Sequence, residues 1–497
     1  MRKRTASPGL GSLTSAALTA TSTLVVSGFA AVVGVIIAHE FGRTDATDGF
    51  FAAYGVYIVV VLASQAIRIA VLPSLARARS ERHLAGAVAG FAIALAVVAV
   101  PLLVVAYAAT GPIADVLTGS GSPTAQSVCA DALRWLLPAA IAHLFAGLAA
   151  SGLAALDDYA IAAAGYALGS AAALVFILSR VDTDGIAALW HGVALNGAVS
   201  VCVPAVGLAL RALRARMPAT AVRPSGLPLR ARLGIFATAA SLPIALQLLY
   251  VLCLPFAGRV ESGAVTSFGY AYLAAASLVS TTAFSIGLVS SVPLTRIGLD
   301  GKAVARHVSS AGWVALTVIG AAVGAFAVAG GQIVERVLGD AYGGDIGTEV
   351  SRLVVVLSPW MIASVGVNVS FPLAFVVGRL RLLPLIGAVA LVAQLLLAWI
   401  GSELFELDGL AVSLALTTLL VLGLLLRELD AVSPGLWGIA RAAVVIAGVA
   451  VIAFLPLGLA VGSVAAAIAG VAVYAGVLAV WRPAGLTGSW SYLRALR

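Results

Sequence analysis

The sequence has little charge. Only 10% of its 497 residues are Asp, Glu, Lys or Arg, whereas soluble domains carry about a quarter. Apolar residues make up 62% of the chain, and the mean hydropathy is +1.09. A water-soluble core of this length has no use for so much apolar surface. The composition therefore excludes water-soluble enzymes and binding modules, and it predicts one polytopic membrane protein in which polar stretches are confined to short loops.

Cysteine and lysine are also scarce, and nucleotide-binding motifs are absent from the sequence. The three cysteines, Cys129, Cys202 and Cys253, lie in separate apolar runs, too dispersed for a disulfide framework or a metal site. The sequence contains no P-loop, nucleophile elbow or glycine-rich phosphate loop. We therefore expect neither an enzyme nor a cofactor. In a membrane protein, Lys and Arg accumulate in the cytoplasmic loops, and this accumulation explains the net charge of +8. We therefore expect no nucleic acid partner.

Long apolar runs are present instead. A helix that crosses a bilayer needs about 20 predominantly apolar residues, and a scan on this criterion finds fourteen segments. They are, approximately, 15–38, 50–75, 84–109, 127–151, 158–179, 186–210, 233–257, 264–292, 308–333, 350–376, 382–402, 408–426, 437–457 and 460–481. The predicted fold class is an all-α polytopic membrane protein with about fourteen transmembrane helices.

The basic residues orient these segments. With the N-terminus in the cytoplasm and fourteen crossings, the inner loops hold 21 of the 29 basic residues and the outer loops hold four. The remaining four lie within spans. Because Lys and Arg accumulate in cytoplasmic loops, this distribution predicts an even number of spans with both termini cytoplasmic.

One basic linker divides the chain. Residues 211–232 contain six arginines and no acid. We predict a six-helix lobe over 1–210, this linker, a second six-helix lobe over 233–427, and two further helices with a basic tail over 428–497. A weak internal sequence repeat supports two related lobes. Aromatic and glycine residues lie at the outer entrance of the second and eighth spans, and a Pro–Arg pattern lies at the cytoplasmic end of each of these spans. Equal span numbers predict lobes related by an axis along the membrane normal.

Polar groups inside spans are costly and often line a cavity. Eight such residues are candidate cavity residues: Gln65 and Arg68 on the second span, Asp131 and Arg134 on the fourth, Asn196 on the sixth, Gln247 on the seventh, and Ser277 and Thr281 on the eighth. Purely structural roles stay open for all of them. Both arginines can snorkel to an interface, Asp131 can neutralise Arg134 one turn away, and hydroxyls also serve helix packing.

Two motifs carry a family resemblance. The first is Phe41-Gly42 followed by Asp48-Gly49-Phe50-Phe51-Ala52-Ala53, and the second is Gly263-Ala264-Val265, Tyr270-Ala271 and Pro293-Leu294-Thr295-Arg296. Together with the six-plus-six-plus-two layout, they resemble the MviN/MurJ-type lipid II flippase branch of the multidrug/oligosaccharidyl-lipid/polysaccharide (MOP) exporter superfamily. The chain departs from that branch in two places. Its first helix has no arginine over residues 27–38, and Tyr272-Leu273 replaces the family's Asp-Arg.

The resemblance implies a MOP flippase fold and a function. It implies a monomeric flippase in the bacterial cytoplasmic membrane that contacts membrane lipids. By alternating access it would move a polyprenyl-pyrophosphate-linked glycan, similar to the peptidoglycan precursor lipid II, from the inner to the outer leaflet. The driving force would be the membrane potential or an ion gradient. The missing family arginines leave Arg68 and Arg134 as candidate phosphate partners.

Further functions fit the same sequence. The chain could export another lipid-linked oligosaccharide or polysaccharide unit, or it could be a repurposed or inactive relative. A drug or cation antiporter would need an acid within the membrane, for which Asp131 is the candidate. A membrane glycosyltransferase would need acidic residues on a sizeable outer loop, where Asp45 and Asp48 are available but the loops are short.

Overall fold

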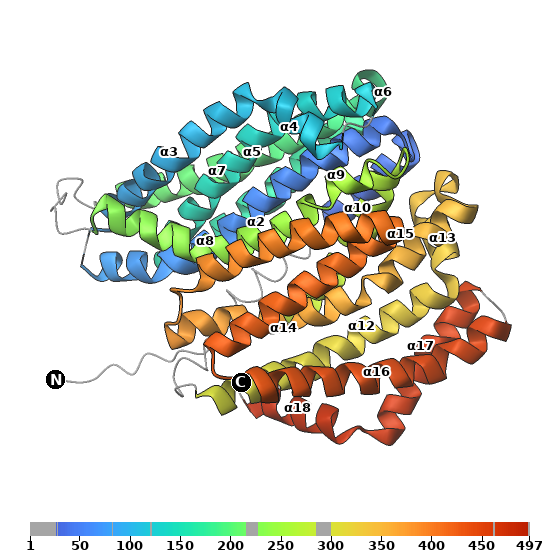
Figure 1. The fold of residues 1–497 in the computed structure, drawn as a ribbon. Coiled ribbons are helices and arrows are strands. Elements are labelled where there is room, and N and C mark those ends of the chain that lie inside the picture. The colour runs from blue at the N-terminus through green and yellow to red at the C-terminus, as the bar shows by residue number, and fades with distance from the viewer. Residues whose placement is uncertain are drawn as a thin grey trace. The chain divides into compact units, whose positions relative to one another are not determined.

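The computed structural model describes residues 26, 28–81, 83–119, 122–214, 227–284, 300–460 and 463–495. Within these ranges every regular element is a helix (Figure 1). The basic residues Arg2, Lys3 and Arg4, much of the basic linker, and the motif Pro293-Leu294-Thr295-Arg296 lie outside the described residues.

The helices follow one another with short connections. A short apolar helix covers Gly28–Phe41. It is followed by α2 (Asp45–Ser80), α3 (Leu84–Ala108), α4 (Thr110–Leu117), α5 (Pro123–Ala155), α6 (Tyr159–Asp184), α7 (Ala187–Arg214), α8 (Leu229–Val251), α9 (Leu254–Ala257), α10 (Ala264–Val279), the π-helix η1 (Ser280–Phe284), α12 (Gly301–Leu338), the 3-10 helix η2 (Asp340–Tyr342), α13 (Gly344–Val356), α14 (Ser358–Val377), α15 (Leu383–Glu428), α16 (Val432–Ala460), α17 (Val464–Trp481) and α18 (Ala484–Ala495).

The length and composition of these helices fit a membrane. Eleven of the described helices are long and apolar enough to cross one. Each of the fourteen predicted segments falls, at least in part, on a described helix. The predicted fold class, an all-α polytopic membrane protein, is therefore confirmed, while the number of crossings stays a prediction.

The 46-residue α15 contains two of the predicted spans and is a hairpin. Its backbone leaves the helical region at Phe405 and Glu406, where Glu406 has a φ of 49°. Gly401 and Gly409 then face each other so closely that a Cβ on either would overlap the backbone of the other. In a straight helix these residues would be about 12 Å apart along the axis. The chain therefore reverses at the Phe405–Glu406 break, which falls in the gap between the predicted spans 382–402 and 408–426.

Several helices begin at a residue that caps them. The side chain of Asp300 accepts a hydrogen bond from the Ala303 amide at 2.7 Å, and that of Ser463 accepts one from the Ala466 amide at 3.3 Å. Such caps satisfy amides that have no partner within the helix. The α14 helix ends at Gly378, whose φ of 77° suits a residue without a Cβ.

The described residues form two compact units. The first contains those of Met1–Phe41, Ala52–Val116 and Pro123–Gln247, and the second contains those of Gly42–Phe51, Leu117–Ser122 and Leu248–Arg497. The predicted second lobe begins at residue 233 and contains most of α8. In the structure, however, α8 belongs to the first unit as far as Gln247. The predicted lobe boundaries themselves stay a prediction, because they concern repeated topology rather than contacts.

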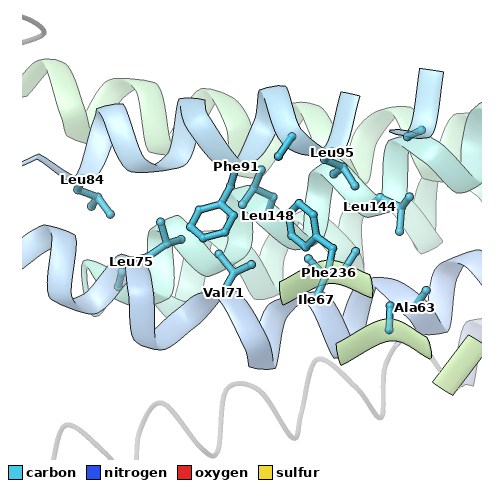
Figure 2. Packing of buried hydrophobic residues seen from close by; sticks show 14 residues of the cluster. Ala63, Ile67, Val71, Leu75, Leu84, Phe91, Leu95, Leu144, Leu148 and Phe236 are labelled. Atoms are coloured by element: carbon cyan, nitrogen blue, oxygen red, sulfur yellow. The ribbon is translucent and has the colours of Figure 1, made fainter. Parts of the chain in front are cut away.

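The core of the first unit lies among α2, α3, α5 and α8. Phe91 of α3 and Phe236 of α8 are 5.7 Å apart between ring centroids, and they pack with Ile67 and Val71 of α2 (Figure 2). In lipid such packing stabilises mainly through close van der Waals contact, because burial away from water no longer distinguishes apolar side chains. The cluster fixes the middle of α2, which carries Arg68.

In the second unit, α16, α17 and α18 pack against α12. A Cβ at Gly324 of α12 would overlap the Phe454 ring of α16, and one at Gly320 would overlap Ile446. Small residues on α12 therefore allow α16 to approach closely, as is usual between membrane helices.

A matching ion pair occurs in both units. Arg211, near the end of α7, pairs with Asp158 before α6 at 2.6 Å. Arg379, before α15, pairs with Asp430 just after α15 at 2.7 Å. In the predicted lobes each pair joins the loop after the fourth helix to the end of the sixth, with the charges exchanged. The parallel repeat itself stays a prediction.

Candidate functional site

Arg68 lies in the first unit, where three helices position it. Its aliphatic stem runs beside Gly147 of α5, and its guanidinium carbon lies 5.7 Å from the centroid of the Tyr166 ring of α6. Its Nη1 donates a hydrogen bond to Gln65 Oε1 at 3.1 Å. Among the described residues no carboxylate pairs with it. The ring and the amide orient the guanidinium without neutralising it, so its charge is available to an anion.

Tyr166 is a residue that the sequence did not reveal. Its hydroxyl is buried and has no hydrogen-bond partner among the described residues. A buried hydroxyl without a partner is costly, which favours a water molecule or a bound ligand beside Arg68. No sequence signal could have found this contact, because an aromatic residue on an apolar helix is usually a packing residue.

Asp131 and Arg134 form a pair of their own on α5. Arg134 Nη1 lies 2.7 Å from Asp131 Oδ1, and both side chains are more than half exposed. Their neighbour Trp135 is exposed on the same helix face. This geometry agrees with the interpretation in which Asp131 neutralises Arg134, since each charge already has its partner.

The other candidates are dispersed. Asn196 accepts a hydrogen bond from Ser200 at 3.0 Å, and both side chains lie against Gly169 of α6, where α6 and α7 pack. Gln247 is half-buried on α8. Ser277 and Thr281 belong to the second unit and are exposed. The structure thus brings Gln65 together with Arg68, and Asp131 together with Arg134, and it places Asn196 at a helix contact.

The hydroxyls of the eighth predicted span accompany an altered helix. Thr281 Oγ1 donates to the Ser277 carbonyl at 2.8 Å, and Thr282 Oγ1 donates to the Leu278 carbonyl at 2.7 Å. At this point α10 widens into the π-helix η1. Hydroxyls that bond back to helix carbonyls compete with the regular pattern, and π-turns are frequent at functional sites.

A second polar centre lies at the start of α10, in the second unit. The helix follows Gly263, whose φ is 83° and which supplies no side-chain cap. Asp48 caps it instead. Its Oδ2 accepts from the Gly263 amide at 2.6 Å, and its Oδ1 accepts from the Thr266 amide at 2.8 Å and the Thr266 hydroxyl at 2.6 Å. A carboxylate at a helix N-terminus also interacts favourably with the helix dipole.

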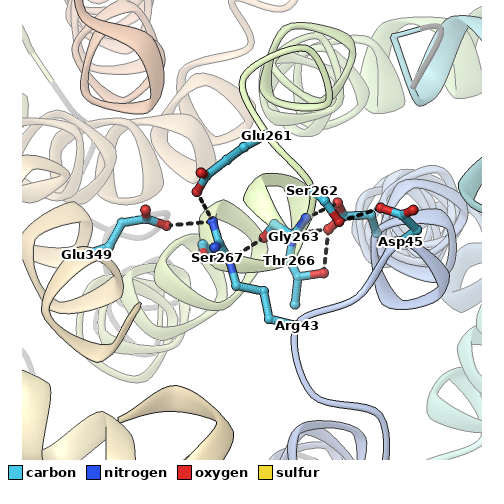
Figure 3. Close-up of polar contacts among 9 residues, drawn as sticks. Arg43, Asp45, Glu261, Ser262, Gly263, Thr266, Ser267 and Glu349 are labelled. Carbon is cyan, nitrogen blue, oxygen red and sulfur yellow. Dashed lines mark hydrogen bonds and ion pairs between the residues drawn. The ribbon is translucent and has the colours of Figure 1, made fainter. Parts of the chain in front are cut away.

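Arg43 extends this centre (Figure 3). Its Nε donates to the Gly263 carbonyl at 3.1 Å and to Ser267 Oγ at 3.0 Å, and its Nη2 pairs with Glu261 and Glu349. The arginine thereby joins the segment before α2 to the start of α10 and to α13. Asp48 and Gly263 belong to the motifs that carry the family resemblance, whereas Arg43 is one of the four basic residues that the predicted topology places in outer loops.

Tyr342 completes the same centre. Its hydroxyl donates to the Gly42 carbonyl at 3.2 Å, and its ring lies 5.4 Å from that of Tyr270. Burial raises the pKa of the Tyr342 hydroxyl above its ordinary value, so it remains a hydrogen-bond donor at neutral pH. The role of the whole centre is structural, because its hydrogen-bond donors are paired with acceptors from the same centre. Within the described residues, no cluster of three His, Cys, Asp or Glu residues could hold a metal ion.

Comparison with known proteins shows the fold. No protein-family model matches the chain, and no curated protein matches it. Among solved structures, it is similar to the lipid II flippase MurJ in an inward closed conformation, with a TM-score of 0.69 and 13% identity over 93% of this chain and 98% of that one. It is also similar to a MOP superfamily transporter from Pyrococcus furiosus, with a TM-score of 0.56 and 15% identity over 86% and 95% of the two chains.

A multidrug resistance MATE family transporter of the MOP superfamily in an inward-facing conformation gives a TM-score of 0.58 and 15% identity, over 83% of this chain and 98% of that one. The chain therefore has the fold of MOP superfamily transporters. The fold expected from the resemblance to the MviN/MurJ-type branch is confirmed. Because identities are low, the substrate has to be argued from the residues of this chain.

Proposed function

We propose that the protein is a flippase that moves a polyprenyl-pyrophosphate-linked glycan, similar to lipid II, from the inner to the outer leaflet of the bacterial cytoplasmic membrane. The observation that carries this proposal is Arg68, a cation without a carboxylate partner among the described residues, held on a fold shared with a lipid II flippase and other MOP transporters. A cation within a membrane helix costs at least ~2.5 kcal/mol, and an anionic substrate would offset that cost.

Arg68 would act by binding the pyrophosphate. A guanidinium donates two parallel hydrogen bonds to phosphate oxygens, and such charge-assisted pairs are among the strongest polar contacts. Gln65 and Tyr166 would hold the guanidinium in one orientation, and the Tyr166 hydroxyl, which has no partner among the described residues, would donate to the same ligand. Alternating access would then carry the headgroup across while the polyprenyl tail stays in the bilayer. We propose that the monomer works this way, driven by the membrane potential or an ion gradient, with its termini in the cytoplasm.

A second candidate is the export of another lipid-linked oligosaccharide or polysaccharide unit, because the same pyrophosphate chemistry would serve it. Antiport and glycosyl transfer have less support. A cation antiporter would need a free acid, whereas Asp131 is paired with Arg134. A glycosyltransferase would need available carboxylates on a sizeable outer loop, whereas both oxygens of Asp48 accept hydrogen bonds that cap α10, and Asp45 accepts one from Ser262.

The test replaces Arg68 in purified protein reconstituted into liposomes, with flipping of a fluorescent lipid II analogue as the readout. We expect Arg68→Ala to lower the rate by about 100-fold and Arg68→Lys by about tenfold, because one or two charge-assisted hydrogen bonds of about 1.5–3 kcal/mol each are lost. The matched control is Arg134→Ala, which removes an arginine already neutralised by Asp131.

Two outcomes would contradict the proposal. If Arg68→Lys flips at the wild-type rate and Arg68→Ala only lowers expression, Arg68 anchors the helix and does not bind substrate. If the wild-type protein flips no lipid-linked glycan and does not complement a strain depleted of its lipid II flippase, the proposed substrate is wrong.

A further inference from the structure

A second arginine of the first unit has a buried guanidinium nitrogen with no hydrogen-bond partner in the part of the chain that the structure describes. Arg232 lies near the start of α8, and its guanidinium carbon is 5.6 Å from the centroid of the Phe91 ring of α3. Its Nε is buried and has no hydrogen-bond partner among the described residues. The sequence placed Arg232 in the cytoplasmic linker, as one charge among six. The structure places it beside Phe91, a residue of the Phe91–Phe236 cluster.

Gly90 of α3 leaves the space in which this guanidinium lies, and we call this space the seat of Arg232. A Cβ at Gly90 would overlap Nη1, Nη2 and the guanidinium carbon of Arg232. The charged group therefore lies directly on the α3 backbone, in the space that any other residue would fill with its side chain. A long flexible side chain held in such a place has a fixed head, and a fixed head binds a ligand at a lower entropic cost.

Nothing on the two helices neutralises the charge. Neither α3 nor α8 contains an Asp or Glu, and Arg230 adds a second positive charge two residues from Arg232 along the chain. The first turn of α8 also carries the positive end of the helix dipole. The seat therefore favours an anion.

The surroundings favour an anion with a hydrocarbon chain. Beyond Gly90 the same face of α3 presents Ile93, Val97, Val100 and Val104, which are 48% to 61% exposed. Their spacing of three and four residues aligns them in one stripe, about 17 Å long at 1.5 Å per residue. The stripe begins at the seat of Arg232.

We propose that Arg232, Gly90 and Phe91 form a binding site for the phosphate of a membrane lipid, with the lipid chain lying along the exposed stripe of α3. The guanidinium donates to the phosphate oxygens, and the Phe91 ring lies beside the guanidinium. The lipid is either the pyrophosphate-linked substrate on its way to Arg68 or a phospholipid of the bilayer. The first assignment rests on the proposed function, whereas the lipid-phosphate site does not.

Binding to the full-length protein in alkyl maltoside micelles, which contain no phosphate, tests the proposal without requiring transport. The probes are polyprenyl pyrophosphate, phosphatidylglycerol and inorganic pyrophosphate, and the readout is the dissociation constant of each. We expect Arg232→Gln and Gly90→Ala to weaken binding of at least one lipid by about tenfold. Gly90→Ala is the sharper variant, because it keeps the charge and removes only the seat, and because the flexible arginine can swing aside without unfolding the protein.

Matched controls lie on the same helix. Arg230→Gln removes an equal charge from an exposed position, and Gly234→Ala adds a methyl group where no atom lies within 4 Å. Both should bind within about twofold of wild type. Sensitivity to polyprenyl pyrophosphate alone identifies the substrate as the lipid, and sensitivity to phosphatidylglycerol identifies a bilayer phospholipid.

Three results would overturn the proposal. Wild-type affinity for both lipids in folded Arg232→Gln and Gly90→Ala removes the site. An equal loss in Arg230→Gln shows diffuse charge rather than a seat. Inorganic pyrophosphate that binds as tightly as either lipid removes the role of the apolar stripe. If the site binds lipid but the liposomes show no flipping, the proposed function fails while the site stands.

Discussion

At the scale of single residues, charges in this chain act through contacts between distant positions. Asp48 caps a helix whose first amide partner, Gly263, lies 215 residues later, and Arg43 joins the same helix to α13. Arg68 and Arg232 contact aromatic rings and have no carboxylate partner among the described residues. The few charged residues therefore fall into two kinds: those that are paired with other groups of the protein, such as Asp48, and those that can pair with a ligand, such as Arg68.

Asp48 should therefore contribute strongly to stability. Asp48→Ala leaves two buried amides and a hydroxyl without an acceptor, so we expect the free energy of unfolding to fall by about 3 kcal/mol. Asp48→Asn keeps one acceptor oxygen and should cost about half as much. Reversible unfolding in mixed micelles measures both values.

Asp45 provides the control for this cap. It accepts a hydrogen bond from Ser262 at a more exposed position, so Asp45→Asn should change the free energy of unfolding by less than about 1 kcal/mol. Equal effects of Asp45→Asn and Asp48→Asn would show that the cap of α10 is not specific.

At the scale of elements, the hairpin of α15 depends on backbone contact between its two arms. Gly401 and Gly409 allow this contact, and deeper in the hairpin Gln394 Nε2 donates to Ser413 Oγ at 3.1 Å and to Cys253 Sγ at 3.2 Å. Two predicted spans thus pack as one unit, held by glycine near the turn and by polar contacts in the interior, as is common between membrane helices.

Gly409→Ala should open this hairpin. The added methyl group would overlap the backbone of Gly401, which cannot move aside as a side chain can, so we expect a destabilisation of about 3 kcal/mol. Thermal unfolding of the purified protein measures it. Gly423→Ala lies on the same helix with no atom within 4 Å of the new Cβ, and it should be neutral or slightly stabilising. Equal melting temperatures of the two variants would exclude the tight contact.

At the scale of the whole molecule, the main question is how the helices are oriented across the membrane. The basic residues predict fourteen crossings with both termini inside, and the corresponding ion pairs Asp158–Arg211 and Arg379–Asp430 would both lie at the cytoplasmic ends of their helices. Pairs at equivalent places in the two predicted lobes are expected if the lobes repeat in parallel.

Reporter fusions test this orientation. Alkaline phosphatase should be inactive when fused after Arg216, which lies in the predicted inner linker, and active after Gly343, which lies in a predicted outer loop. Fluorescent protein fusions should give the opposite result, because they fold only in the cytoplasm. Location of both positions on the same side would refute the fourteen-helix topology.

The membrane class, the approximate spans and the break in α15 follow from the order of the amino acids alone, because long apolar runs and the gaps between them act locally along the chain. The sequence also identified the Gln65–Arg68 and Asp131–Arg134 neighbours, since residues three apart share a helix face. The partners of Asp48, the contact of Tyr166 with Arg68 and the position of Arg232 on Gly90 emerge only when the helices pack. These contacts join helices far apart in sequence, and helix packing, which has no short-range periodic signal, sets which residues meet.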